Sequence, residues 1–172
     1  MSIKFYLLFL FVFAGAKNFA QDIFEAARNG DIQRTAALIQ INPDTIHKKN
    51  ANGFTPLIIA GYRNQIRLVE FLLGHKADIN ASSPEGPVIL GACYKGNLEL
   101  TELLIKYKAD VNACNEMGTS ALMYAVLSGN VALVKLLLKH GAKKDLVEKS
   151  GKTALNYAKM HDSPELFALL SE

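Results

Sequence analysis

The sequence predicts an all-α solenoid of about five stacked helix-turn-helix units with projecting turns, because two motifs recur along it. The first motif begins at residues 55, 87, 120 and 153, so successive copies are 32, 33 and 33 residues apart. The second motif is rich in leucine and follows each copy of the first. A period in this range is typical of supersecondary units that stack on their neighbours. The copies of the first motif read TPLIIA, PVILGA, SALMYA and TALNYA.

Each copy of the first motif has the features of a helix start. Ahead of the first copy, Gly53 suits a turn because glycine tolerates a positive φ. Thr55 is placed to cap the helix, and Pro56 stands at an early helical position, where proline is tolerated. Leu57 and Ala60 lie three residues apart and share one helical face. We expect these helices to be broken at Asn64, Gly96, Gly129 and Asp162.

The second motif predicts an amphipathic helix in each unit. Its apolar residues recur at i, i+3 and i+4, as in Leu133, Leu136 and Leu137. An N-terminal unit at residues 23–41 lacks the Thr-Pro start, as expected for a terminal repeat with one solvent-facing side. We expect a single domain over residues 21–172. Its predicted units cover about 22–52, 53–85, 86–117, 118–150 and 151–172.

Together the two motifs resemble the ankyrin repeat, whose signature of about 33 residues contains T-P-L-H-x-A. The resemblance covers roughly residues 22–172. It implies that the turns project as fingers and form a concave groove with the first helices. The third unit departs from the pattern because it lacks one residue near Pro87. The signature His, which normally joins a hydrogen-bond network between repeats, is replaced by Ile58, Leu90, Met123 and Asn156.

A second departure from the pattern falls at the end of the second helices. Lys76 and Lys108 stand where Gly141 stands in the next repeat. If this position requires a left-handed backbone, each lysine costs about 1 kcal/mol relative to glycine.

Residues 1–20 predict a secretory signal peptide. Lys4 precedes twelve uncharged, mostly large apolar residues that end in Ala14-Gly15-Ala16, which is the order of a basic, an apolar and a small-residue region. Cleavage after Ala16 or Ala20 fits this pattern, and we favour Ala20 because Gln21 then opens the domain. The alternative is an uncleaved membrane anchor. Twelve residues of helix are about 18 Å long, too short for a hydrocarbon core of roughly 30 Å.

The charge balance gives no support for nucleic-acid binding. The full chain has a formal net charge of +3, but removing residues 1–20 leaves 17 basic and 16 acidic residues, for a net charge of +1. Binding to nucleic acid requires a basic face with many phosphate contacts. We therefore expect neither a nucleic-acid partner nor a small-molecule substrate, and contact with a membrane only through an uncleaved leader.

No constellation of residues predicts catalysis, a metal site or a cofactor. The nucleophile, metalloprotease, phosphate-loop and dinucleotide motifs are missing from the sequence. His75 and His140 occupy equivalent places at second-helix ends, where a cation caps the free carbonyls. Cys93 falls at a packed helix position and Cys114 in an exposed turn, so we expect no disulfide between them. Cys114 is either a free thiol or an ordinary turn residue.

The resemblance to ankyrin repeats implies a binding face made of finger and first-helix positions. Several of these positions carry apolar side chains that are edged by cations. Tyrosine and arginine are enriched among the residues that anchor protein interfaces. The expected partner-binding residues are Phe54, Tyr62, Arg63, Tyr94, Lys95, Met117, Leu127 and Lys152.

The sequence thus predicts a monomeric, non-catalytic module that binds an unidentified protein in the periplasm or outside the cell. A leader directly ahead of a small repeat domain is similar to exported bacterial ankyrin proteins, some of which are associated with catalase-dependent peroxide defence. Two alternatives stay open at this point. One is a scaffold or stabiliser of an envelope enzyme, and the other is a secreted effector that acts on a host protein.

Overall fold

The computed structural model describes residues 23–161 and 163–171, so the predicted leader and Asp162 lie outside the described residues. Residues 23–29 are helical and pair with α2 (Ile32–Ile41), which is followed by a 3₁₀ helix, η1 (Pro43–His47). The remaining helices form four successive pairs. These are α3 (Pro56–Tyr62) and α4 (Ile66–Gly74), α5 (Val88–Tyr94) and α6 (Leu98–Lys106), α7 (Ala121–Leu127) and α8 (Val131–Lys139), and α9 (Ala154–Ala158) and α10 (Pro164–Ser171).

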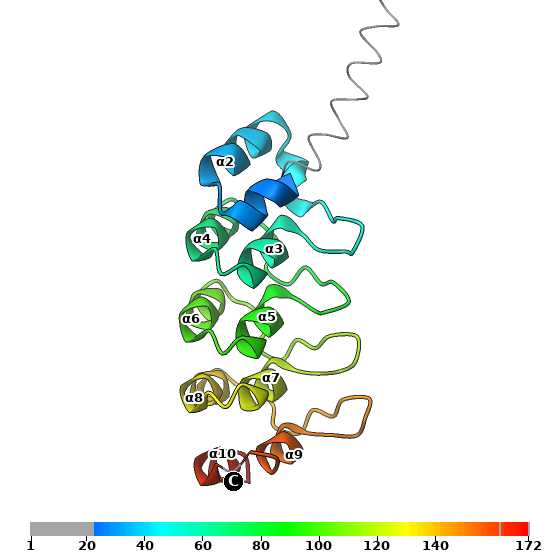
Figure 1. The fold of residues 1–172 in the computed structure, drawn as a ribbon, viewed down its shortest axis with the longest axis vertical. Helices are drawn as coiled ribbons and strands as arrows, with labels where there is room; N and C mark the ends of the chain where they lie inside the picture. Colours follow the sequence, from blue (N-terminus) through cyan, green and yellow to red (C-terminus); the bar gives the residue numbers. More distant parts are fainter. Residues whose placement is uncertain (1–22, 162, 172) are drawn as a thin grey trace, which may run out of the picture.

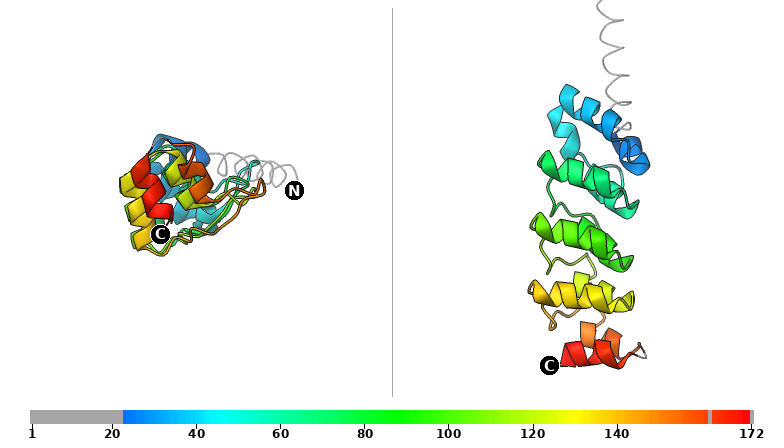
Figure 2. Two further views of the ribbon diagram at one scale, coloured as in Figure 1. Left: turned by 90° about the horizontal axis from the view of Figure 1, so that it is seen from below. Right: turned by 90° about the vertical axis from the view of Figure 1, so that its left-hand side faces the viewer.

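The helix pairs stack into an elongated solenoid, as predicted (Figure 1). The first helices, α3, α5, α7 and α9, form one column in which α5 packs against both α3 and α7. The second helices, α4, α6, α8 and α10, form a parallel column (Figure 2). The connections between pairs project from the first-helix column as long turns. Within the described part of the chain there is no strand, only an isolated antiparallel bridge between Cys114 and Ser120.

The first helices begin where the sequence predicts. Thr55 Oγ accepts a hydrogen bond from the Ile58 amide at 3.3 Å, and Pro56 occupies the first turn of α3. Ser120 caps α7 through the Met123 amide, also at 3.3 Å. Such caps satisfy amides that have no partner within the helix. In α5 the cap residue is Pro87, which has no side chain able to do this.

One continuous hydrophobic core runs through the stack. Leu72, Leu104 and Leu137 occupy equivalent places in three second helices, and each has no exposed surface. The recurring alanine of the first motif is buried in every unit, which lets adjacent first helices approach closely. Since each unit buries its apolar face against the next, the core depends on stacking and not on any one unit.

The first unit contains an element that the sequence pattern did not predict. The segment after α2 forms η1, in which Asn42 Oδ1 accepts a hydrogen bond from the Asp44 amide at 3.1 Å. An asparagine followed by proline favours such a local turn.

The turns are held together without the signature His. Asn112 Oδ1 accepts a hydrogen bond from the Lys143 amide at 2.8 Å, and its Nδ2 donates to the Gly141 carbonyl at 3.1 Å. Asn80 Oδ1 accepts in the same way from the Asp110 amide at 3.0 Å. These asparagines link consecutive repeats through side-chain hydrogen bonds.

The predicted left-handed position at the end of the second helices is confirmed. The φ angles of Lys76 and Lys108 are 66° and 70°, and that of Gly141 is 86°. At the same helix ends, His75 caps α4, where its Nδ1 lies 2.8 Å from the Phe71 carbonyl oxygen, and His140 caps α8.

Replacing Lys76 or Lys108 by glycine should raise the free energy of unfolding by about 1 kcal/mol each, because glycine removes the left-handed strain. Urea denaturation measures this change. The reciprocal control is Gly141→Lys, which should cost a similar amount, since open space surrounds a side chain added at that glycine. Lysine-to-glycine variants that are less stable than the parent would contradict the strain argument.

Candidate functional site

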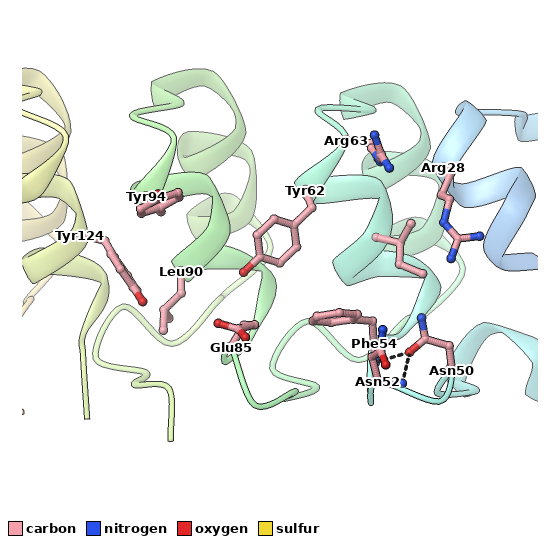
Figure 3. A pocket seen from close by; sticks show the side chains of 11 residues that line it. Arg28, Asn50, Asn52, Phe54, Tyr62, Arg63, Glu85, Leu90, Tyr94 and Tyr124 are labelled. Atoms are coloured by element: carbon pink, nitrogen blue, oxygen red, sulfur yellow. Dashed lines mark hydrogen bonds between the residues drawn. The ribbon is translucent and has the colours of Figure 1, made fainter. Parts of the chain in front are cut away.

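A groove of about 520 Å³ lies between the first helices and the projecting turns, on the face where the sequence places the binding site (Figure 3). It extends from the first unit to the fourth. Aromatic and apolar side chains form much of its lining, two arginines stand at one end, and a glutamate lies near its middle. The lining residues are Arg28, Asn50, Asn52, Phe54, Ile59, Tyr62, Arg63, Glu85, Leu90, Tyr94 and Tyr124.

Tyr62 is the central side chain of this groove. Its ring meets that of Phe54 edge to face, with 6.0 Å between the ring centroids. On its other side the ring lies over Gly91 of α5, where an added Cβ would come within 3.1 Å of two ring carbons. Other units carry Ile59 or Tyr124 at the place of Gly91. The missing side chain at Gly91 therefore allows the Tyr62 ring to rest on the next repeat.

A second aromatic pair closes the groove toward the C-terminus. The rings of Tyr94 and Tyr124 meet edge to face with centroids 5.5 Å apart. Asn115 Nδ2 donates to the Tyr124 hydroxyl at 3.0 Å and so holds that ring in place. Tyr94 is 62% exposed, which leaves most of its surface available to a partner.

The third turn is one residue shorter than its neighbours and contributes one side chain fewer to this face. In the neighbouring turns a residue stands between the glycine and the helix cap, as Phe54 does after Gly53. Gly86 is followed directly by Pro87, which is itself the cap of α5. No side chain equivalent to Phe54 therefore projects from the third unit, and Leu90 is left to form the floor between the two aromatic pairs.

Charge is distributed unevenly along the groove. Arg28 and Arg63 stand at its N-terminal end, whereas Glu85 stands below the Tyr62 hydroxyl, on the side of the turns. Burial raises the pKa of the Tyr62 hydroxyl, and the negative charge of Glu85 raises it further. The same two causes, in the same order, raise the pKa of the Tyr124 hydroxyl.

The structure brings half of the predicted binding residues together. Phe54, Tyr62, Arg63 and Tyr94 line the groove, although the first two are half-buried and not exposed as expected, because they pack against the core. Lys95 lies beside the groove, where its ammonium donates to the Tyr62 carbonyl.

Three predicted binding residues are not part of the groove lining. Met117 and Leu127 are 55% and 38% exposed and lie farther along the stack. The ammonium of Lys152 lies 5.4 Å from the ring centroid of Tyr157. These positions lie outside the groove, toward the C-terminal units.

The sequence interpretation missed Tyr124 and Leu90 as site residues. Both belong to the repeated motif, and the motif as a whole predicts buried helix positions. A signal was present nevertheless. The position of Tyr124 is occupied by Ile59 and Gly91 in two other units, and a position at which repeats disagree is free to serve binding.

A hydrogen-bonded carboxylate ties together the last two turns. Glu148 accepts hydrogen bonds from the hydroxyls of Thr119 at 3.0 Å, Ser150 at 2.5 Å and Tyr157 at 2.6 Å. The bonds from Ser150 and Tyr157 are the main causes that lower the pKa of Glu148. In return, the bond to Glu148 is the main cause that raises the pKa of Tyr157 to about 12.

The stabilising effect of Glu148 should therefore disappear in acid. Its pKa is lower in the folded state than the unfolded value of about 4.3, so its contribution is present above that pH and is lost as pH falls through the folded pKa. The difference in unfolding free energy between the parent and Glu148→Gln should be largest near neutral pH and shrink below about pH 4. Urea denaturation across this range measures it. A difference that is independent of pH would contradict the assignment.

The two cysteines are free thiols in very different settings. Cys93 is fully buried, and burial raises the pKa of its thiol to about 12, as expected for a small core residue. Cys114 is half-buried and not exposed as expected, because its turn pairs with Ser120. Burial and the charge of Asp110 raise the pKa of the Cys114 thiol, which lowers its reactivity.

The residues that the structure describes contain no cluster of His, Cys, Asp or Glu able to hold a metal ion. The described helices include none that is long and apolar enough to cross a membrane. The fold is a helical repeat solenoid with an open groove whose lining includes four aromatic side chains.

The comparison with protein families agrees with this class. A model described as ankyrin repeats in three copies matches residues 89–172, and a model of the single ankyrin repeat matches residues 52–84. Together these matches cover more than half of the chain, and the chain belongs to the ankyrin-repeat family. Members of this family are typically non-catalytic and mediate interactions between proteins. No curated protein matches the chain.

Proposed function

We propose that this protein is an exported, non-catalytic interaction module that binds another protein through the face formed by its turns and first helices. The observation that carries the proposal is the aromatic groove centred on Tyr62 and Tyr94. Interfaces are anchored by a few large side chains near their centre, and tyrosine and arginine are prominent among them. The groove combines both residue types on a rigid scaffold.

Export is the second part of the proposal, and it rests on residues 1–20 alone. Their basic, apolar and small-residue regions follow the order of a secretory signal peptide. The mature chain then begins at Gln21 and acts as a monomer in the periplasm or outside the cell. Mass spectrometry of the N-terminal peptide of the isolated protein tests this part independently of binding.

Replacing Tyr62 and Tyr94 together by alanine should weaken binding of the partner at least about tenfold, since each loss of an anchoring ring costs on the order of 1–2 kcal/mol. The partner is first captured by affinity purification with cross-linking from the compartment into which the protein is exported. Its affinity for the parent and variant proteins is then measured by calorimetry.

Phe167→Ala is a matched control, because Phe167 is a 42% exposed aromatic residue on α10, away from the groove. It should leave the affinity unchanged. Circular dichroism checks that the double variant remains folded. An affinity that survives the loss of both tyrosines would refute the proposed face.

A further inference from the structure

The groove contains a carboxylate that has no partner among the described residues. Glu85 is exposed at the tip of the third turn, and no hydrogen bond or ion pair of its side chain is found within residues 23–161 and 163–171. The turn that carries it is well fixed. The Gly86 amide donates to the Ser83 carbonyl at 2.8 Å, and Ser83 Oγ donates to the Gly86 carbonyl at 3.0 Å. The fold therefore fixes the backbone of the turn from which this charge projects.

Nearby lysines do not neutralise Glu85. The ammonium of Lys49 donates to the Ser82 carbonyl at 2.8 Å, and that of Lys95 donates to the Tyr62 carbonyl. Arg28 and Arg63 stand at the N-terminal end of the groove, on the far side of Tyr62 from Glu85 (Figure 3). The region around Glu85 is thus a negative site in the middle of a groove whose N-terminal end is positive.

Tyrosine rings surround this negative site. Tyr62 directs its hydroxyl toward Glu85, while Tyr94 and Tyr124 stand on the far side of Leu90 (Figure 3). The raised pKa values of Tyr62 and Tyr124, to which the charge of Glu85 contributes, agree with this proximity. A cation is attracted by the faces of aromatic rings as well as by a carboxylate.

The recess between the rings also has an apolar floor. Leu90 contributes to this floor, although only 1% of its surface is exposed, and no side chain equivalent to Phe54 projects from the short turn at Gly86. The side chains of lysine and arginine bury an apolar stem while they keep a charged head at a polar partner. Such a side chain would match each part of the recess, with its stem on Leu90, its flanks against tyrosine rings and its charge at Glu85.

We propose that the recess between Tyr62, Tyr94 and Tyr124 receives a lysine or arginine side chain of the protein partner, whose charge pairs with Glu85. This inference rests on the proposed function and deepens it, because it names the chemistry that the groove selects. The cation of the partner enters from the side of the turns, between Glu85 and the Tyr94–Tyr124 pair, where it avoids the two arginines at the N-terminal end.

The experiment is a selection of random peptides displayed on phage against the purified protein. Peptides selected by the parent should share a lysine or arginine at one position. Glu85→Gln should lower the affinity of a selected peptide about tenfold. Replacing the shared basic residue of the peptide by methionine should lower its affinity for the parent protein to a similar degree. A fresh selection with Glu85→Lys should enrich Asp or Glu at that position instead.

Glu102→Lys is the matched control, since it makes the same charge change at an exposed residue of α6, in the second-helix column. Glu102→Lys should change neither the affinity of the selected peptides nor their shared basic residue. The inference would be overturned if the selected peptides share no basic residue. It would also be overturned if their affinity for the Glu85→Lys variant equals their affinity for the parent.

Failure of this inference can be told apart from failure of the proposed function. Suppose that the selected peptides lose affinity for the Tyr62→Ala, Tyr94→Ala variant but bind the Glu85→Lys variant with the affinity they have for the parent. The groove then binds peptides, and only the cation inference is wrong. If they bind that double variant as well as the parent, or if no peptide is enriched, the result counts against both proposals.

Discussion

Replacing Leu104 by alanine is expected to lower the free energy of unfolding by about 2–5 kcal/mol. Leu104 lies in α6 of the central unit and has no exposed surface. Truncation removes apolar contacts and leaves a cavity, because neighbouring helices relax only in part. The free energy of unfolding of natural domains is about 5–15 kcal/mol, so this single substitution removes a large fraction of it.

The position of Leu104 in the stack adds to this effect. In a solenoid each unit contacts only its neighbours, and loss of a central unit separates the N-terminal from the C-terminal repeats. Urea denaturation followed by circular dichroism should show a lower midpoint. Leu127→Ala is a matched control at a 38% exposed leucine and should change the stability little. Equal effects at the two leucines would contradict the burial that the structure assigns.

Replacing Gly61 by alanine is expected to cost about 1–3 kcal/mol, although alanine is the better helix former. A Cβ at Gly61 would lie 2.2 Å from Val88 Cγ2, so α3 and α5 would have to move apart. Packed interiors transmit such a displacement because they contain few voids. The cost therefore arises from contact between repeats and not from the helix itself.

Two further variants isolate this contact. Gly74→Ala in α4 meets no atom within 4 Å and should raise the stability by about 0.4–1 kcal/mol, because it restricts the unfolded chain. Combining Gly61→Ala with Val88→Ala should cost less than the two single changes added together, since the clash is removed. Thermal or urea unfolding of the parent, the three single variants and the double variant measures these differences. Strict additivity would show that the two residues do not meet.

The sequence was sufficient to predict the architecture because the repeat constrains it several times over. The same cap residues, buried alanines and amphipathic second helices recur in successive units, so each copy supports the interpretation of the others. The left-handed position at Lys76 and Lys108 was also predictable, since Gly141 occupies the same place in a related unit. Comparison between units supplied information that a single unit does not contain.

The candidate site was only partly predictable, because its shape depends on contacts between units. Tyr62 and Tyr94 were predicted from their place on the first helices. The resting place of the Tyr62 ring on Gly91 and the recess above Leu90 follow from which side chains are missing in the neighbouring unit. Tyr124 was missed because its motif position is buried in the second and third units, at Ile59 and Gly91.

The departures of the third unit from the repeat thus have a structural consequence. Despite the residue missing after Gly86 and the glycine at position 91, α5 still packs against α3 and α7. These two departures remove two side chains from the inner face instead. We infer that the unit least like its neighbours is the one that shapes the binding groove.

The most direct test of the central claim is site-specific photo-cross-linking in the producing cell. Benzoylphenylalanine placed at Tyr94 should give a discrete cross-linked product with the partner after irradiation, because Tyr94 is the most exposed aromatic residue of the groove. The same group placed at Glu102, in the second-helix column, should give none. A product from Glu102 with none from Tyr94 would show that the partner binds the other face, and would contradict the account.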